Sequence, residues 1–125
     1  MPETPDRQTL GKHGETLARH ELERRGYAIL ATRFRTRFGE IDIVCSREGT
    51  IVFVEVKARR SLKYGAAAEA ITPWKRRRIA AMALDYLAWN DKLNQPCRFD
   101  VVAIDGIGTE RTAIRVIEDA FQVDR

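Results

Sequence analysis

Two apolar segments joined by a short turn constrain the fold of this 125-residue chain more than any other feature. Residues Glu40 to Ser46 and Thr50 to Ala58 are rich in β-branched residues, and Glu48-Gly49 between them is typical of a hairpin turn. A turn symmetric about this dipeptide gathers six apolar side chains on one face: Ile41, Ile43, Cys45, Val52, Val54 and Val56. Because a one-residue slip would turn these side chains to the opposite face, the pattern predicts the register of the hairpin.

The same register predicts opposed charges on the other face of the hairpin. Asp42 lies opposite Glu55, and Glu40 lies opposite Lys57. Directly opposed residues have Cβ atoms roughly 5 Å apart, so two facing carboxylates repel each other and call for a compensating cation. A hard divalent ion such as Mg²⁺, with Mn²⁺ as a substitute, suits an all-oxygen site, and Lys57 adds a charge that can stabilise phosphate oxygens. The alternative is an ordinary solvent-exposed hairpin face.

The remaining segments predict two helices and three further strands. The first helix runs from about Leu10 to Arg25, with Gly26 at its C-terminal cap, and Thr72-Pro73 opens a second helix that ends near Trp89. The segment Lys63–Ile71 before it reads as a loop. The further strands are predicted at Tyr27–Phe34, Phe99–Ile104 and Ala113–Ile117. This order predicts an α/β fold with a central mixed β-sheet flanked by α-helices.

Length and composition limit the class of protein. A chain of this length favours one domain, and 44% hydrophobic with 32% charged residues is typical of a soluble globular protein. We expect residues 1–9, which are polar and include Pro2 and Pro5, to form a flexible tail, and residues 10–125 to form the domain. The N-terminus lacks the apolar segment of a signal peptide, so we expect a cytoplasmic protein with no membrane partner.

Positive charge is concentrated in one part of the chain. The formal net charge is +4, whereas the segment from Lys57 to Arg78 carries +7 and the rest therefore carries −3. This distribution favours a nucleic acid as partner, and a solvated charged face is the alternative. Four of these cations fall in the first turns of a helix, where they oppose its dipole unless a phosphate docks there. The basic residues predicted to bind nucleic acid are Arg59, Arg60, Lys63, Lys75, Arg76, Arg77 and Arg78.

Three other residues have two readings each. Glu15 lies on or beside the buried stripe of the first helix, so it is either a third acid of the site or the partner of Arg19. Trp74 could stack on a nucleic-acid base, but the residue pattern favours a packing role. Asp100 could lie near the site, but a structural salt bridge is the favoured interpretation.

Several motifs together resemble a known family. They are Gly14-Glu15, Arg25-Gly26-Tyr27 with Ile29-Leu30, Phe38-Gly39-Glu40-Ile41-Asp42-Ile43-Val44, Val52-Phe53-Val54-Glu55-Val56-Lys57-Ala58-Arg59 and Arg98-Phe99-Asp100-Val101-Val102. Over about Gly11 to Ile104, the chain resembles the YraN-like family of small bacterial proteins. That family is similar to archaeal Holliday-junction resolvases and to the PD-(D/E)XK nuclease superfamily, although Ile41 stands where the superfamily has a proline.

The resemblance implies a restriction-endonuclease-like fold and Mg²⁺-dependent hydrolysis of DNA, with branched or junction DNA as the substrate. It implies Asp42, Glu55 and the carbonyl of Val56 as metal ligands, with Lys57 as the catalytic lysine and Glu15 as a helix-borne acid. Symmetric cutting of a junction would require a homodimer.

The resemblance also places Lys75 roughly where related nucleases have a basic or amide residue on the following helix. Three alternatives remain open from the sequence. The chain could be a non-catalytic nucleic-acid-binding module, an interaction subunit of a larger machine, or a nuclease that acts on RNA.

Overall fold

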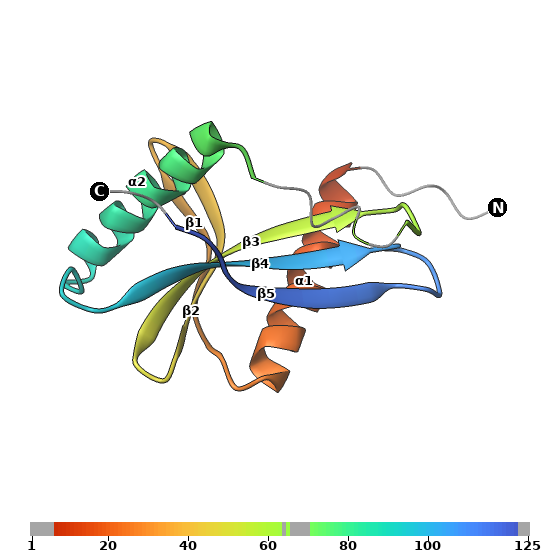
Figure 1. The fold of residues 1–125 in the computed structure, drawn as a ribbon, viewed down its shortest axis with the longest axis horizontal. Helices are drawn as coiled ribbons and strands as arrows, with labels where there is room; N and C mark the ends of the chain where they lie inside the picture. The colour runs from red at the N-terminus through yellow and green to blue at the C-terminus, as the bar shows by residue number, and fades with distance from the viewer. Residues whose placement is uncertain (1–6, 64, 66–70, 123–125) are drawn as a thin grey trace.

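One five-stranded sheet forms the centre of the molecule. The computed structural model describes residues 7–63, 65 and 71–122. Their elements are α1 (Arg7–Arg24), β1 (Ala28–Thr36), β2 (Gly39–Arg47), β3 (Thr50–Arg59), α2 (Pro73–Trp89), β4 (Cys97–Asp105) and β5 (Ala113–Phe121). The strand order is β1-β2-β3-β4-β5, and all neighbours are antiparallel except β3 and β4, which are parallel (Figure 1). The predicted α/β fold with a mixed sheet and flanking helices is therefore confirmed, and it is consistent with a nuclease-like fold.

The element bounds differ from the predicted ones mainly at their ends. Helix α1 begins at Arg7, so residues 7–9 of the predicted flexible tail are helical, and residues 1–6 lie outside the described residues. Strand β5 continues to Phe121, four residues beyond its predicted end. Helix α2 begins as predicted, because the Thr72 hydroxyl accepts a hydrogen bond from the Lys75 N–H at 3.2 Å and Pro73 follows the cap. Of the predicted loop at 63–71, residues 64 and 66–70 lie outside the described residues.

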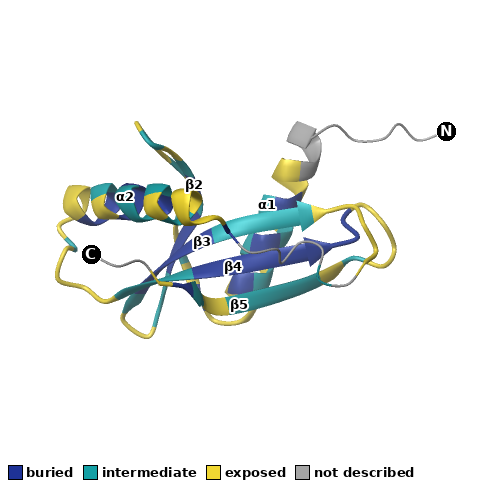
Figure 2. Ribbon diagram, turned by 45° about the horizontal axis from the view of Figure 1, so that its top comes forward, coloured by how far each residue is buried: buried dark blue, intermediate teal, exposed yellow. Residues whose placement is uncertain are grey.

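Each face of the sheet carries its own hydrophobic core under one helix. Helix α1 packs Ala18 and Leu22 onto one face, against residues such as Val54. Helix α2 packs onto the other face, where Met82 and Phe53 belong to the same core (Figure 2). The first half of β3 and most of β4 are buried, as expected for neighbouring parallel strands, whereas β3 from Glu55 onward is more exposed (Figure 2). Neither of these described helices is both long enough and apolar enough to cross a membrane.

The predicted hairpin register is confirmed between the Ile43–Val54 and Arg47–Thr50 pairs, where the ladder ends, and the prediction of one apolar face is wrong at Ile41. The β2–β3 ladder runs from the Ile43–Val54 pair to the Arg47–Thr50 pair, as predicted. Ile41 belongs to the α2 core, whereas Ile43 belongs to the α1 core. On the N-terminal side of Ile43, β2 is paired with β1 and no longer with β3. The in-and-out alternation of the β2–β3 hairpin therefore no longer determines which face of the sheet the side chains of β2 point to.

A buried polar network joins β4 to the strands around it. Asp100 is fully buried, and its carboxylate accepts hydrogen bonds from Arg98 Nε at 3.0 Å and from the Asp119 N–H at 3.0 Å. The Tyr27 hydroxyl lies 3.4 Å from the same carboxylate. The structural reading of Asp100 is therefore confirmed, because a buried carboxylate requires such partners.

We predict that Asp100→Ala lowers the free energy of unfolding by about 3–5 kcal/mol, since it leaves a partly buried guanidinium and a backbone N–H without their acceptor. Urea denaturation followed by circular dichroism measures the change. The control is Glu118→Gln, because Glu118 accepts hydrogen bonds in the same network but its side chain is 52% exposed. This control should cost less than about 1 kcal/mol, and equal effects of the two substitutions would contradict the prediction.

Candidate functional site

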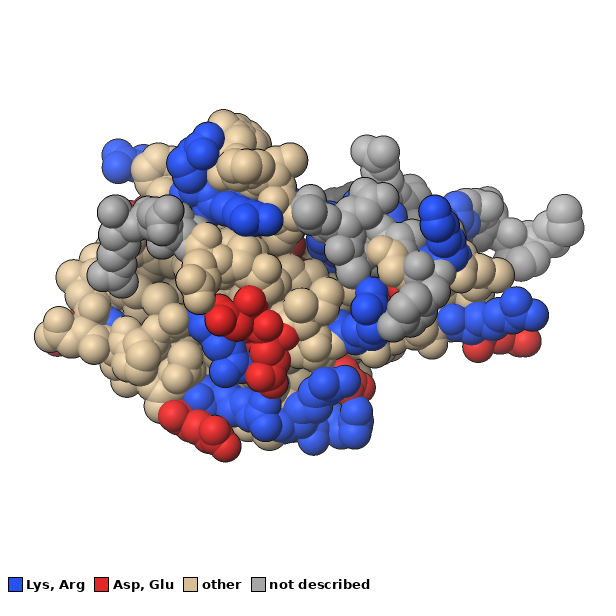
Figure 3. All heavy atoms as spheres, viewed as in Figure 1, with Lys and Arg blue, Asp and Glu red and all other residues tan. Residues whose placement is uncertain are grey.

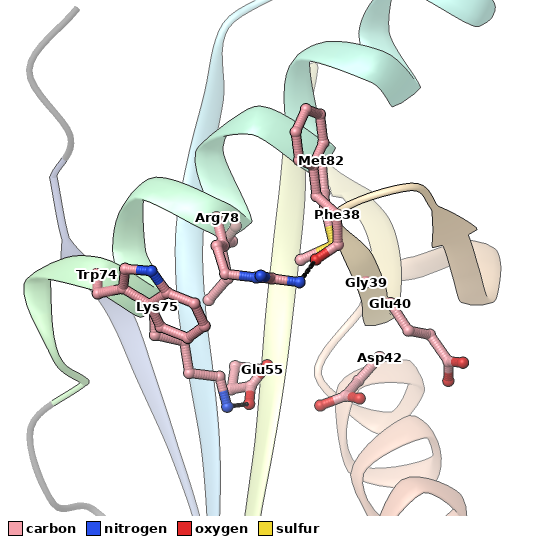
Figure 4. Close-up of a pocket in the computed structure, with 10 residues that line it drawn as sticks. Phe38, Gly39, Glu40, Asp42, Glu55, Trp74, Lys75, Arg78 and Met82 are labelled. Atoms are coloured by element: carbon pink, nitrogen blue, oxygen red, sulfur yellow. Dashed lines mark hydrogen bonds and ion pairs between the residues drawn. The ribbon is translucent and has the colours of Figure 1, made fainter.

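An open cavity of about 380 Å³ lies between the first turns of α2 and strands β2 and β3 (Figure 4). Its acidic side chains come from the strands, and its basic side chains come from the helix. The described lining residues are Phe38, Gly39, Glu40, Asp42, Glu55, Trp74, Lys75, Arg78, Ile79 and Met82. The cavity therefore brings together two of the residues predicted to bind metal, Asp42 and Glu55, and two predicted to bind nucleic acid, Lys75 and Arg78.

Asp42 is held where β2 leaves β3. Its Oδ2 accepts a hydrogen bond from the Val56 N–H at 2.8 Å, in place of a backbone pair at this point of the hairpin. Burial and the nearby charge of Glu55 raise the pKa of Asp42 from 3.8 to about 7. A carboxyl group in this environment either keeps its proton near neutral pH or requires a cation beside it.

Glu55 has such a cation within the chain. Lys75 reaches down from α2, and its Nζ lies 2.5 Å from Oε1 of Glu55 (Figure 4). The Glu55 side chain is only 13% exposed, whereas that of Lys75 is 48% exposed. The ammonium group therefore lies at the solvent side of the acid pair, where it can also reach an incoming anion.

Glu15 approaches the site from α1 on the other face of the sheet. Arg33 of β1 donates a hydrogen bond from Nε to Oε2 of Glu15 at 2.7 Å. After burial and Glu55, the charge of Glu15 also raises the pKa of Asp42, so the two acids interact electrostatically. The predicted alternative partner of Glu15 is wrong, because Arg19 pairs with Glu23 at 3.9 Å.

Sequence reasoning missed Arg33. This residue has a φ of 51°, in the left-handed region that favours glycine. It lies between the Thr32–Ile43 and Phe34–Ile41 pairs of the β1–β2 ladder, and therefore opposite Asp42. An arginine within a strand gives no sequence signal for this conformation, so its pairing with Glu15 could not be anticipated.

Lys57 and Glu40 lie at the margin of the site. Lys57 is on the same side of β3 as Glu55, two residues further along, and it is partly buried but outside the described lining of the cavity. Glu40 lines the cavity, and the β2–β3 ladder ends at the Ile43–Val54 pair, before it could place Glu40 opposite Lys57. Glu40 lies beside Arg35 in the β1–β2 ladder, and Arg35 Nη2 lies 3.3 Å from its Oε2.

The basic residues predicted to bind nucleic acid fall into two separate groups. Arg59, Arg60 and Lys63 are exposed at and beyond the end of β3, away from the first turn of α2 (Figure 1). The other group lies on α2 itself. On the face shown in Figure 3, basic side chains also lie over α2 and in separate groups elsewhere, with acidic side chains between them. The run that is continuous in sequence is therefore not one continuous patch.

Within the α2 group, packing distinguishes the four cations. Arg76 donates from Nε to the Ile71 carbonyl at 2.9 Å, and its guanidinium lies over the Phe121 ring, so it supports the core. Arg78 donates to the Phe38 carbonyl and lines the cavity with Lys75. Arg77 is exposed.

The favoured packing role for Trp74 is wrong. Its side chain is 60% exposed, and it lines the mouth of the cavity. The reason is its place in the first turn of α2, one turn before the residues that pack on the sheet. Arg78 lies one helical turn further on, with its guanidinium 4.7 Å from the Trp74 ring centroid.

Among the residues that the structure describes, no group of three or more His, Cys, Asp or Glu side chains could hold a metal ion. Three carboxylates line the cavity, and Glu40 is paired with Arg35, so Asp42 and Glu55 are the acid pair at its centre. Fold and site together define a class: a small α/β protein with a nuclease-like sheet and an acidic cavity beside a basic helix terminus.

Comparison with known proteins assigns the chain within this class. It belongs to the uncharacterised protein family UPF0102, the YraN family, whose model matches residues 14–104. A UPF0102 protein of Symbiobacterium thermophilum is 44% identical over 112 residues, covering 90% of this chain and 95% of the relative. A UPF0102 protein of Roseiflexus castenholzii is 46% identical over 121 residues, covering 95% of this chain and 98% of the relative.

The raised pKa of Asp42 predicts how stability depends on pH. The unfolded chain releases this proton near pH 4 and the folded protein releases it near pH 7, so the folded protein binds more protons between these values. The contribution of Asp42 to the free energy of unfolding therefore falls as the pH rises from about 4 to 7. Asp42→Asn keeps an acceptor for the Val56 N–H and removes the charge, so it should gain stability over the wild type across this range.

We expect this gain to reach on the order of 4 kcal/mol at pH 7, since the pKa shift is about three units and each unit corresponds to about 1.4 kcal/mol. Chemical denaturation at several pH values, with EDTA present, measures it. Glu110→Gln, a change of an exposed turn residue, serves as the control and should show no such trend. A difference between Asp42→Asn and wild type that stays constant with pH would refute the assignment.

Proposed function

We propose that this chain is a metal-dependent endonuclease that hydrolyses phosphodiester bonds of DNA, with branched or junction DNA as its substrate. The observation that carries the proposal is the pairing of Asp42 and Glu55 in one open cavity beside Lys75. Two carboxylates brought together away from water destabilise each other, and burial with the charge of Glu55 raises the pKa of Asp42 to about 7. A site that maintains this repulsion is better explained by cation binding than by stability.

The donor set fits a divalent ion that takes part of its coordination from the substrate. Mg²⁺ commonly binds one or two protein carboxylates together with phosphate oxygens and water. Asp42 and Glu55 would hold the ion, and the carbonyl of Val56 would be a further ligand. Mn²⁺ accepts the same oxygen ligands. Of the three carboxylates in the described lining, Glu40 pairs with Arg35, so the Asp42 and Glu55 pair fits a site completed by a phosphate group.

When bound, the ion supplies Lewis-acid polarisation of the scissile phosphate. The chain's own residues then have distinct roles. Lys57 orients the attacking water and offsets the charge that develops on the phosphate. Glu15, whose carboxylate is fixed by Arg33, directs a water molecule from the α1 side of the site. Lys75 and Arg78 hold phosphate oxygens at the mouth of the cavity.

The basic residues bind the DNA backbone largely without reading sequence. The two groups, one at the end of β3 and one on α2, fit two backbone segments better than one straight duplex, which favours a branched substrate. Symmetric cutting of a junction needs two such sites, so we propose that the active form on junctions is a homodimer.

A second candidate function is a non-catalytic DNA-binding module with the same fold. The observation in its favour is the 2.5 Å contact between Lys75 and Glu55, which already neutralises one of the two carboxylates. This candidate predicts DNA binding without cleavage and without metal uptake.

We predict that wild-type protein cleaves junction or flap DNA with Mg²⁺ or Mn²⁺, and that Asp42→Ala lowers the rate by at least about 100-fold. The expected loss is large because changes merely adjacent to metal ligands already cost about 10–100-fold. Gel-based cleavage assays with labelled substrates measure the rate. Glu110→Gln is the matched control, because it removes an exposed carboxylate remote from the cavity and should leave the rate unchanged.

Two results separate the candidates. Equal inertness of wild type and Asp42→Ala, with DNA binding intact in both, would establish the non-catalytic module. Cleavage that survives Asp42→Ala would indicate a contaminating nuclease or a different site. Either result removes the proposed function.

Lys75 gives an independent prediction about metal binding. Because its ammonium group occupies Glu55, Lys75→Gln should increase the affinity for Mn²⁺ in the absence of DNA. An ion pair with an exposed partner is worth up to about 1 kcal/mol, which corresponds to an increase of up to about fivefold. Isothermal titration calorimetry with Mn²⁺ measures the affinity.

The control for Lys75→Gln is Arg77→Gln, which makes the same change in net charge two residues away on the exposed surface of α2. An equal increase in both variants would mean that only overall charge matters. Unchanged or weaker Mn²⁺ binding in Lys75→Gln would show that the ion does not compete for Glu55.

A further inference from the structure

One exposed aromatic side chain lies at the candidate cleavage site. Trp74 is 60% exposed and lines the same cavity as Asp42 and Glu55 (Figure 4). Other large apolar side chains are also exposed, but among those described Trp74 is the one that lines this cavity: Leu30, Leu62, Leu84, Trp89 and Leu93 lie outside its lining. An indole kept in water beside two acids contributes little to the core, so its position calls for another explanation.

The Trp74 ring is held in place by contacts that leave most of it accessible. The Arg78 guanidinium lies 4.7 Å from the ring centroid. Arg78 is itself fixed, because its Nη2 donates to the Phe38 carbonyl at the start of β2. This chain of contacts links the indole to the strand that carries Asp42. The ring is therefore positioned before any ligand arrives, which reduces the entropy lost on binding.

The remainder of the cavity has an apolar part and a charged part. Phe38, Ile79 and Met82 contribute apolar walls, and Glu55 and Lys75 lie toward β3. A volume of about 380 Å³ is at the lower end of the range of about 300–1,000 Å³ typical of small-molecule sites. Such a space suits a single nucleotide, with a base against the apolar and aromatic surfaces and its phosphate beside the charged groups.

We propose that Trp74 stacks on an unpaired DNA base next to the scissile phosphate, so that the site selects DNA with single-stranded character. This proposal rests on the proposed function and names its substrate more closely. In an intact duplex both faces of a base are covered by neighbouring base pairs, and an indole can stack only on a base that has left the stack. Flaps and the open centres of junctions supply such bases without the cost of unpairing them.

The test compares two DNA substrates and three Trp74 proteins. Fluorescence anisotropy in EDTA, where cleavage plays no part, measures the affinity for a blunt duplex and for the same duplex carrying a single-stranded flap. Wild type should bind the flap more tightly. Trp74→Ala should weaken flap binding about tenfold, in line with stacking energies of about 1–3 kcal/mol per base, and change duplex binding less than about twofold. Trp74→Phe should retain most of the flap preference.

The matched control is Trp89→Ala. Trp89 is also an exposed tryptophan of α2, 64% exposed, but it lies at the other end of the helix. It should change neither affinity. In the Trp89→Phe protein, Trp74 is the remaining tryptophan, and its fluorescence should be quenched by the flap DNA and not by the duplex.

Three outcomes would overturn the proposal. They are equal weakening of flap and duplex binding by Trp74→Ala, an absence of any effect of that substitution, and equal affinity of wild type for both substrates. Flap preference that depends on Trp74 in a protein that cleaves nothing with Mg²⁺ would support the stacking role while removing the proposed function. The two failures are therefore distinguishable.

Discussion

The hydrogen bond from the Val56 N–H to the Asp42 carboxylate is the interaction on which the arrangement of the site depends. At this point β2 leaves β3, and a partly buried backbone N–H would otherwise lose its acceptor. Because the side chain of Asp42 takes the place of the missing strand partner, its carboxylate is fixed toward the space that opens between the strands. Continued pairing would close that space, so the cavity and its acid pair have one local origin.

Counter-charges around this opening are distributed unevenly. Glu55 is paired with Lys75 from α2, and Glu15 is paired with Arg33 from β1. Asp42 is bonded to a backbone N–H, which carries only a partial charge. Burial and the charge of Glu55 accordingly raise its pKa to about 7. Asp42 is therefore the one of these three acids that has no side-chain cation directly paired with it among the described residues.

The features that could be predicted from the sequence follow from local residue patterns. The features that could not be predicted depend on tertiary contacts. The hairpin register follows from alternation within β2 and β3, and the start of α2 follows from Thr72 and Pro73, so both were correct. The face of Ile41 depends on where β2 leaves β3, and the φ of 51° at Arg33 falls between two regular pairs of the β1–β2 ladder. No periodicity encodes either feature. The acids Asp42 and Glu55 were found because their spacing is local, whereas Arg33 was missed because its role is not.

Several departures from ordinary local preferences lie together around Asp42, while others lie elsewhere in the described residues, such as the positive φ of Glu48 and Asp119. A non-glycine residue with positive φ, a pair of carboxylates in one cavity, cations in the first turn of a helix and an exposed indole all occur around Asp42. Each of these features costs stability, and the two hydrophobic cores offset that cost. The group around Asp42 lines or adjoins one opening, and this supports the proposed site there.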